Sequence, residues 1–296
     1  MDWLQRINGA MNYIEDNLTE DIDYSRMAKI ACCSSYHFQR MFSFITDVTI
    51  AEYVRRRRLT LAAFELQDSK IKVIDLAVKY GYESPESFSR AFQNMHGVTP
   101  SLAREKGIQL KAYPRMSFHI SIKGDVEMNY KIEEKDSFKV FGVEEIIDTT
   151  GGNNLVRIPK MWSESFENGT YKRLEDAAPK GQIQGLCSVN AIMCYRYTDT
   201  DTFPYMIGAI DFKGDAEIPE EFTSISVPAL TWAIFKTEEH KEGETTEKIQ
   251  DIWKRIFPEW FPNSGYEHAE GPELELYYSL GKDRCYSEVW IPVVKK

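Results

Sequence analysis

Two short runs of the sequence place an arginine between two phenylalanines, with the same spacing both times. Phe38-Gln39-Arg40-Met41-Phe42 and Phe88-Ser89-Arg90-Ala91-Phe92 share the pattern F-x-R-x-F, and each is followed by a Val-Thr pair. An arginine can donate two hydrogen bonds to guanine O6 and N7, and a glutamine can pair with adenine N6 and N7. If the phenylalanines are buried, Gln39, Arg40 and Arg90 face outward. The repeat then predicts a surface that contacts bases or phosphates, and ion pairing at the surface is the alternative.

Carboxylates stand beside aromatic residues near the C-terminus. Alternation along a strand places Glu273, Glu275 and Tyr277 on one face, and Glu288 and Trp290 share a face of the last strand. This mixture suits an organic cation, which is attracted both by a carboxylate and by aromatic faces. The alternative is that these faces meet water, which would make the glutamates inert.

The five cysteines and five histidines form no recognisable reactive pattern. The sequence contains no C-x-x-C, H-E-x-x-H or G-x-S-x-G run. We therefore expect no metal site, no cofactor and no catalytic residues. The cysteines are interpreted as small buried apolar residues in a reducing compartment.

Size and charge divide the chain unevenly. Its 296 residues suffice for two domains, and its net charge is −10. Residues 1–112 hold 15 basic and 14 acidic residues, whereas the remainder holds 21 basic and 32 acidic residues. Only the first part is a plausible partner for a polyanion. We find no signal peptide and no apolar run of membrane-spanning length, so we expect a cytoplasmic protein without membrane contact.

The first repeat reads as two helix-turn-helix units in an all-α domain over residues 1–112. In the second unit a helix over Val73 to Tyr80 precedes Gly81, which permits a tight turn, and Ser84 caps a helix that begins at Pro85. In the first unit Cys32 and Cys33 occupy the turn, with Ser34 or Ser35 as the cap. A second helix placed in this way can enter the major groove of DNA.

A longer helix over Ile50 to Leu66 is expected to link the two units. It carries Arg55 to Arg58, which we interpret partly as solvated surface and partly as candidate phosphate contacts. Residues 113–128 lack periodicity and are interpreted as a junction, with a strand at Ser117 to Ile122.

A second repeat covers residues 129–296 and predicts an α+β domain built from two β-α-β-β units. Trp162 and Phe166 match Trp253 and Phe257, each pair one helical turn apart. The expected strands are Lys139 to Ile147, Val189 to Tyr197, Tyr205 to Phe212, Ala229 to Thr237, Leu274 to Leu280 and Tyr286 to Val294.

The first repeat resembles the AraC/XylS family of transcription regulators over about residues 5–108. Tyr80-Gly81-Tyr82-Glu83-Ser84, the Phe88 run and Gly97-Val98-Thr99-Pro100-Ser101 look like the family signature. The resemblance implies double-stranded promoter DNA as a partner, RNA polymerase as a candidate partner, and activation as a mode of regulation. Its base-facing positions would be Tyr36, Gln39, Arg40, Ser87, Ser89 and Arg90. The sequence departs from the family at Pro85 and Glu86, where relatives often carry polar base-reading side chains.

The second repeat resembles the gyrase-inhibitor-like (GyrI-like) effector-binding domain over about residues 129–294, ending in Glu288-Val289-Trp290-Ile291-Pro292-Val293. The order of the two domains is similar to that of Rob-like regulators. This resemblance implies a small organic effector, with a cation as the candidate. The expected ligand residues are Glu275, Glu288, Tyr277, Trp290, Trp162 and Tyr195. The alternatives are a hydrolase acting on small electrophiles and a protein-interaction module.

Overall fold

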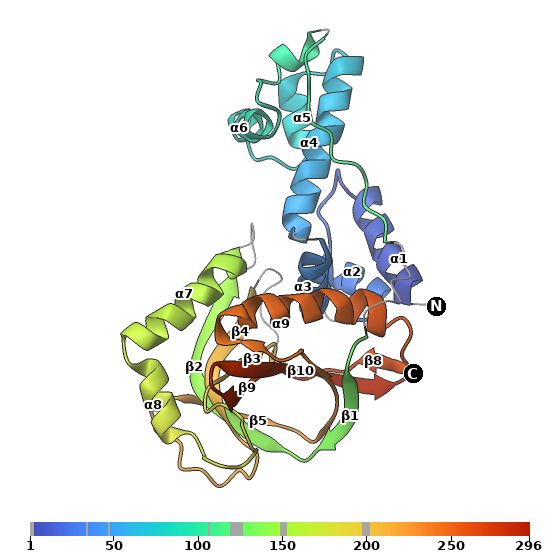
Figure 1. Ribbon diagram of the computed structural model, residues 1–296. Coiled ribbons are helices and arrows are strands. Elements are labelled where there is room, and N and C mark those ends of the chain that lie inside the picture. Colours follow the sequence, from blue (N-terminus) through green and yellow to red (C-terminus); the bar gives the residue numbers. More distant parts are fainter. Residues whose placement is uncertain are drawn as a thin grey trace. The chain divides into compact units, whose positions relative to one another are not determined.

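The structure is a computed structural model that describes residues 3–33, 35–46, 48–105, 107–118, 127–148, 153–196 and 202–296. It consists of two compact units (Figure 1). Unit 1 comprises Met1–Ser43 and Val48–His119, and unit 2 comprises Phe44–Asp47 and Ile120–Lys296. Each unit is described separately below.

Unit 1 is built from helices, as the repeat predicts. They are α1 (Trp3–Asp16), α2 (Tyr24–Ala31), α3 (Ser35–Thr46), α4 (Ile50–Asp68), α5 (Val73–Lys79), α6 (Pro85–His96) and the 3₁₀ helix η1 (Leu102–Arg104). Helices α2 and α3 form the first helix-turn-helix, and α5 and α6 form the second. Helix α4 is the expected link between them (Figure 1). The phenylalanines of both F-x-R-x-F runs are fully buried, which explains their spacing.

The turns of the two helix-turn-helix units share one backbone geometry. Gly81 adopts a left-handed φ of 73°, and Cys32 adopts a φ of 56° at the equivalent place. In each turn one backbone N–H donates to the carbonyl three residues earlier, from Gly81 to Val78 or from Cys32 to Lys29. The N–H of the next residue donates to the carbonyl five residues earlier. These bonds form a Schellman motif, which satisfies carbonyls at the helix end. A cysteine therefore holds a conformation that favours glycine.

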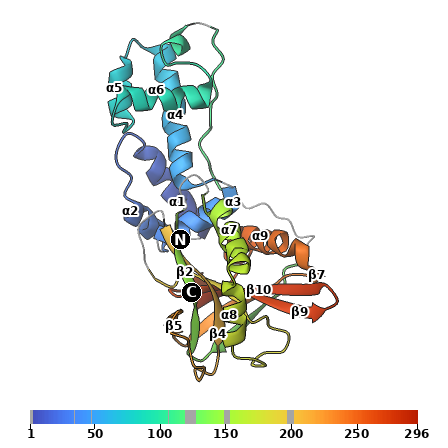
Figure 2. The same cartoon turned by 90° about the vertical axis from the view of Figure 1, so that its left-hand side faces the viewer.

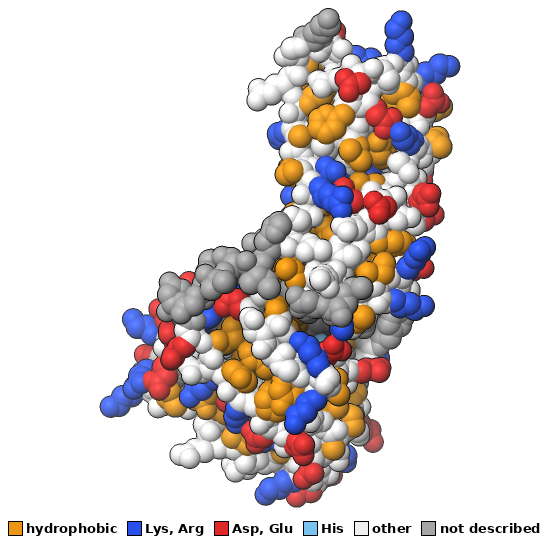
Figure 3. All heavy atoms as spheres, turned by 90° about the vertical axis from the view of Figure 1, so that its right-hand side faces the viewer, with side chains coloured by type: hydrophobic (Ala, Val, Ile, Leu, Met, Phe, Trp, Pro, Cys, Tyr) orange, Lys and Arg blue, Asp and Glu red, His pale blue; other side chains and the backbone are white. Residues whose placement is uncertain are grey.

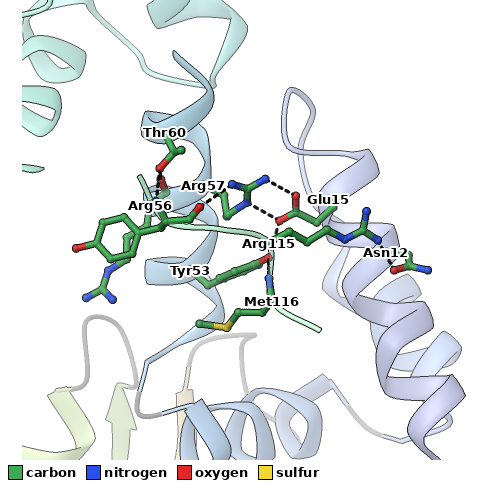
Figure 4. A network of polar contacts seen from close by, with 9 residues as sticks. Asn12, Glu15, Tyr53, Arg56, Arg57, Thr60, Arg115 and Met116 are labelled. Atoms are coloured by element: carbon green, nitrogen blue, oxygen red, sulfur yellow. Dashed lines mark hydrogen bonds and ion pairs between the residues drawn. The ribbon is translucent and has the colours of Figure 1, made fainter. Parts of the chain in front are cut away.

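The arginine run of α4 has mainly structural contacts. Arg57 is 8% exposed, and its guanidinium donates to both carboxylate oxygens of Glu15, at 2.8 and 2.9 Å, and to the Tyr113 carbonyl (Figure 4). Arg58 donates to the carbonyls of Leu18 and Glu20 at 2.8 Å. These two arginines therefore fasten α4 to the end of α1 and the residues after it. The expectation of solvated surface is wrong for Arg57, because an arginine can be buried once a carboxylate pairs with it.

The residues expected to begin the junction pack against unit 1. The Tyr113 N–H donates to Thr60 Oγ1, and the Met116 N–H donates to Tyr53 Oη, both at 3.0 Å. The Phe118 N–H and C=O both bond the Asn8 side chain at 2.9 Å. Ser117 and Phe118 are not in a strand, and residues 119–122 of the expected strand lie outside the described residues.

Unit 2 is an α+β domain with an antiparallel sheet, and the predicted β-α-β-β duplication is present (Figure 2). The strands are β1 (Tyr130–Lys135), β2 (Phe138–Asp148), β3 (Asn190–Met193), β4 (Thr202–Asp211), β5 (Thr223–Val227), β6 (Leu230–Lys236), β7 (His240–Lys241), β8 (Tyr266–His268), β9 (Glu273–Gly281) and β10 (Arg284–Lys295). The helices are α7 (Asn153–Glu167), α8 (Thr170–Ala177) and α9 (Thr245–Arg255), with the short helices η3 (Glu242–Glu244) and η4 (Ile256–Trp260) beside α9.

The strand order β1-β6-β10-β9-β3-β4-β2-β5 places the two repeats side by side. They meet where β9 pairs with β3, at Ala191 and Glu275. Helices α7 and α9 contact one face of the sheet through Trp162 and Trp253. The opposite face of the sheet is curled into a concave surface. Phe138 of β2 and Trp232 of β6 lie far apart in the strand order, yet their ring centroids on this face are only 6.2 Å apart. This curled face encloses the main apolar core of unit 2.

None of the helices within the described ranges is both long enough and apolar enough to cross a membrane.

Candidate functional site

Helix α6 presents a polar face in unit 1. Its start is fixed by a capping box, in which the Ser87 N–H donates to Ser84 Oγ at 3.1 Å and the Ser84 N–H donates to Ser87 Oγ at 3.3 Å. Ser87 is a predicted base contact, but its hydroxyl group takes part in the cap. There it also donates a hydrogen bond to the Ser84 carbonyl at 2.8 Å. Ser89 is half-buried, and Arg90 and Glu86 are exposed. Arg90 is thus the predicted base-reading residue that α6 presents most openly.

Helix α3 differs from the expectation at Gln39, which is 6% exposed rather than outward-facing. Its amide lies 3.5 Å from Ser35 Oγ. The reason is helical spacing, because Gln39 follows Ser35 by four residues and precedes the buried Phe42 by three. The backbone of α3 is described at Tyr36 and Arg40, but the side chains of these two predicted base contacts lie outside the description.

The charges on unit 1 do not form one continuous basic patch on the face drawn in Figure 3. Basic and acidic side chains alternate there with hydrophobic ones. This agrees with the near balance of basic and acidic residues over 1–112. Contact with DNA must therefore rest on the placement of particular side chains rather than on a general positive field.

A carboxylate surrounded by aromatic side chains lies on the helix-covered face of unit 2. Glu275 of β9 accepts a hydrogen bond from Trp253 Nε1 of α9 at 2.7 Å and from Tyr277 Oη at 3.1 Å. Trp162 of α7 packs edge-on against Tyr277, with centroids 5.7 Å apart, and its Nε1 donates to Tyr205 Oη at 2.8 Å. Both helices thus bring a tryptophan to one strand.

The side chains of this site differ in burial, and Glu275 is among those that solvent can still reach. Trp253 and Tyr205 are at most 2% exposed and form a wall, whereas Trp162, Glu275 and Tyr277 are half-buried. Burial, assisted by the neighbouring Glu275 carboxylate, raises the pKa of Tyr277 well above its usual range. Tyr277 therefore remains a neutral phenol that can donate to the carboxylate.

Glu288 and Trp290 lie on the opposite face, which corrects the expectation that they share a site with Glu275. The register pairs Glu275 with Val289 and Leu276 with Glu288, and directly paired residues point to the same face. Glu288 is 7% exposed and accepts from Tyr278 Oη at 3.0 Å and from Trp290 Nε1 at 2.8 Å. These three side chains lie inside the curled face.

Tyr195 is also separate from Glu275. Its hydroxyl donates to Glu144 at 2.5 Å, and its ring packs against the core of the curled face. Arg196 also binds Glu144 and lowers the pKa of that carboxyl. Tyr195 loses the alternation of β3 because Cys194 before it has a left-handed φ of 66°. Of the six predicted ligand residues, Glu275, Tyr277 and Trp162 are the ones brought together.

Sequence reasoning missed Trp253 and Tyr205 as members of this site. The signal for Trp253 was present, because the internal repeat aligns it with Trp162, which was selected. Tyr205 carried no such signal, since only the pairing of Met193 with Tyr205 places it on the helix-covered face.

Two other features of the described chain bear on function. A hollow of about 160 Å³ is lined by residues 179–183, 186–188, 190 and 210, and by none of the predicted ligand residues. Within the described ranges no group of three or more His, Cys, Asp or Glu side chains could hold a metal ion.

Comparisons with known proteins support the same division. Residues 27–106 match a helix-turn-helix domain family, and residues 131–293 match the family described as integron-associated effector binding protein. The chain belongs to the SoxS- and MarA-type helix-turn-helix transcription regulators of the AraC class, and it carries an effector-binding domain of the integron-associated, GyrI-like type.

The relatives each match one part of the chain. The HTH-type transcriptional activator AarP of Providencia stuartii is 39% identical over 98 residues, which are 33% of this chain and 73% of AarP. The regulatory protein SoxS of Salmonella typhimurium is 35% identical over 106 residues, 36% of this chain and 99% of SoxS. An integron cassette protein from the mobile metagenome of Vibrio cholerae aligns with 56% of this chain and 95% of its own, with 15% identity and a TM-score of 0.37.

Proposed function

We propose that the protein is a sequence-specific regulator, acting on promoter DNA in the cytoplasm, whose unit 2 binds a small organic cation at Glu275. Regulation would consist of a change in promoter activity when that cation is bound. Activation is the expected direction, since AarP, a relative of unit 1, is an activator. RNA polymerase is then the expected further partner.

The observation that carries the effector proposal is the set of partners around the Glu275 carboxylate. Its carboxylate is held by two neutral donors, Trp253 and Tyr277, and no described Lys, Arg or His pairs with it. Glu15 and Glu144 each bind an arginine instead. A half-buried carboxylate among aromatic rings attracts a cation by both its charge and the faces of the rings. A lipophilic organic cation fits these surroundings best.

On the DNA side, we propose that α3 and α6 enter successive major grooves, about 34 Å apart along the duplex. Arg90 would read guanine from α6, and Arg40 and Tyr36 would contact the site from α3. Because the two helices differ in sequence, one subunit would recognise an asymmetric site.

The effector proposal is tested with Glu275→Gln, which keeps the shape of the side chain and removes its charge. Calorimetry would compare the cation tetraphenylphosphonium with the neutral triphenylphosphine oxide. We expect the variant to bind the cation at least about tenfold more weakly, about 1.4 kcal/mol. The neutral compound should lose little, because it gains nothing from the charge.

Glu288→Gln is the matched control, because it makes the same change on the other face of the sheet. It should bind both compounds like the unchanged protein. Equal losses for cation and neutral compound in Glu275→Gln would mean that Glu275 acts through structure. Loss of cation binding in Glu288→Gln alone would move the site to the curled face. Incubation with small electrophiles, followed by mass analysis that shows a hydrolysed product, would assign a hydrolase.

A further inference from the structure

Helix α6 carries an acidic residue beside its base-reading arginine. Glu86 and Arg90 are four residues apart, so they lie on the same side of the helix, about 6 Å apart along its axis. Both side chains are exposed, and Phe88 and Phe92 point to the core. Among the described residues, neither Glu86 nor Arg90 has an ion-pair partner, and they do not pair with each other.

Glu86 and Arg90 remain apart although their spacing would allow an ion pair. On α4, Glu52 and Arg56 have the same spacing and bond at 2.6 Å. The capping box of Ser84 and Ser87, with Pro85 between them, fixes the first turn of α6 and holds Glu86 in it. Helix α6 therefore offers a carboxylate and a guanidinium on one face, each with its hydrogen-bonding capacity available to a partner.

The chemistry of base edges gives each group a different target. In the major groove guanine offers O6 and N7 acceptors, which suit arginine, and cytosine offers the N4 amino donor, which suits a carboxylate. Thymine presents the O4 acceptor where cytosine has N4, so a carboxylate that favours cytosine is repelled by thymine. Phosphates also repel it, which lowers binding to DNA of unrelated sequence.

We propose that Glu86 is a specificity-determining residue that selects cytosine in the half-site contacted by α6, close to the guanine read by Arg90. The inference rests on the proposed entry of α6 into the major groove. Glu86 adds selectivity rather than affinity, because its attraction to one base is set against its repulsion from phosphates.

The experiment selects binding sites from a random-sequence double-stranded DNA library at fixed salt, using the full chain and its variants. The unchanged protein should select a cytosine within one or two base pairs of a guanine. In Glu86→Ala the preference for that cytosine should fall at least about fivefold while the guanine preference persists. Glu86→Gln should shift the preference from cytosine towards adenine, because an amide pairs with adenine N6 and N7.

Two further variants make the outcome specific. Arg90→Ala should weaken the preference for guanine and leave the preference for cytosine unchanged. Glu83→Ala removes an exposed carboxylate just before the cap of α6 and should change no base preference. The proposal is overturned if Glu86→Ala keeps the cytosine preference, or if it binds all sequences more tightly by one factor, as pure repulsion from phosphate requires. If the unchanged protein selects no sequence, the proposed DNA-binding function fails with it.

Discussion

Glu15, Glu275 and Glu288 show how the partners of a buried or half-buried carboxylate decide what it can do. Glu15 binds Arg57 and Tyr53 and fastens two helices. Glu288 is enclosed with Tyr278 and Trp290 in the core of the curled face. Glu275 has similar neutral donors but remains half-buried. Accessibility therefore separates a candidate binding residue from two structural ones of the same type.

His96 links the stability of unit 1 to pH. It is 5% exposed, its Nε2 lies 3.3 Å from the Leu59 carbonyl, and its ring packs on Phe92 with centroids 4.2 Å apart. Burial lowers its pKa. The folded state therefore resists protonation, so the free energy of unfolding is undiminished above about pH 6.5 and falls as pH drops through the lowered pKa.

His96→Gln should remove this part of the pH dependence. Urea denaturation of the full chain between pH 7.5 and 5 would show a steeper loss of stability for the unchanged protein than for the variant. His240, the first residue of β7 in unit 2, provides the control, since His240→Gln should leave the unfolding of unit 1 as it was. Parallel pH profiles for the unchanged protein and His96→Gln would contradict the assignment.

At the scale of elements, the two helix-turn-helix turns share a geometry but not a residue. Cys32 is exposed and holds a left-handed φ that glycine adopts without strain. Gly81 holds the same region, and a Cβ there would lie 3.0 Å from Arg58 Nη1. The first turn is therefore strained by its residue type, and the second is not.

Exchanging the residue types should move stability in opposite directions. Cys32→Gly should raise the free energy of unfolding of unit 1 by about 0.5–1 kcal/mol, since relief of strain exceeds the added entropy of the unfolded chain. Gly81→Ala should lower it by about 1 kcal/mol or more, because the new Cβ is strained and meets Arg58. Denaturation midpoints at one pH measure both, and a less stable Cys32→Gly would show that the cysteine side chain contributes more than its backbone costs.

At the scale of the whole molecule, the two units have separate cores. Basic and acidic residues nearly balance over residues 1–112, whereas the remainder of the chain has an acidic excess. Unit 1 extends past the two helix-turn-helix units, because residues 113–118 bond α1 and α4 through their backbone. A boundary at residue 112 would remove these bonds, whereas a boundary after residue 118 would keep them.

A fragment of residues 1–118 should fold and bind the DNA selected by the full chain, with affinity that falls steeply as salt rises. A fragment of residues 1–112 should be less stable by about 2 kcal/mol or more, since several hydrogen bonds of about 0.5–1.5 kcal/mol each are lost. Thermal unfolding and a titration with the selected DNA measure the two properties. Equal stability of the fragments would mean that residues 113–118 only rest on unit 1.

The sequence by itself determined the helical repeat, the duplicated β-α-β-β order and the N-terminal cap of α6. These depend on local spacing: phenylalanines at helical intervals, a serine before a proline, a glycine at a turn. It also predicted the alternation within β9 and within β10 correctly, because successive side chains in any strand point to opposite faces.

Only the tertiary structure decided how β9 and β10 face each other. Gly281 pairs with Arg284 across the hairpin turn, and continuing that register would place Glu275 opposite Trp290, and Tyr277 opposite Glu288. The register instead shifts by one residue between Arg284 and Cys285. A one-residue bulge turns every following side chain to the other face, so Glu275 reaches the helices and Glu288 enters the curled core. Alternation along a strand cannot reveal such a shift, because it is set by pairing between strands.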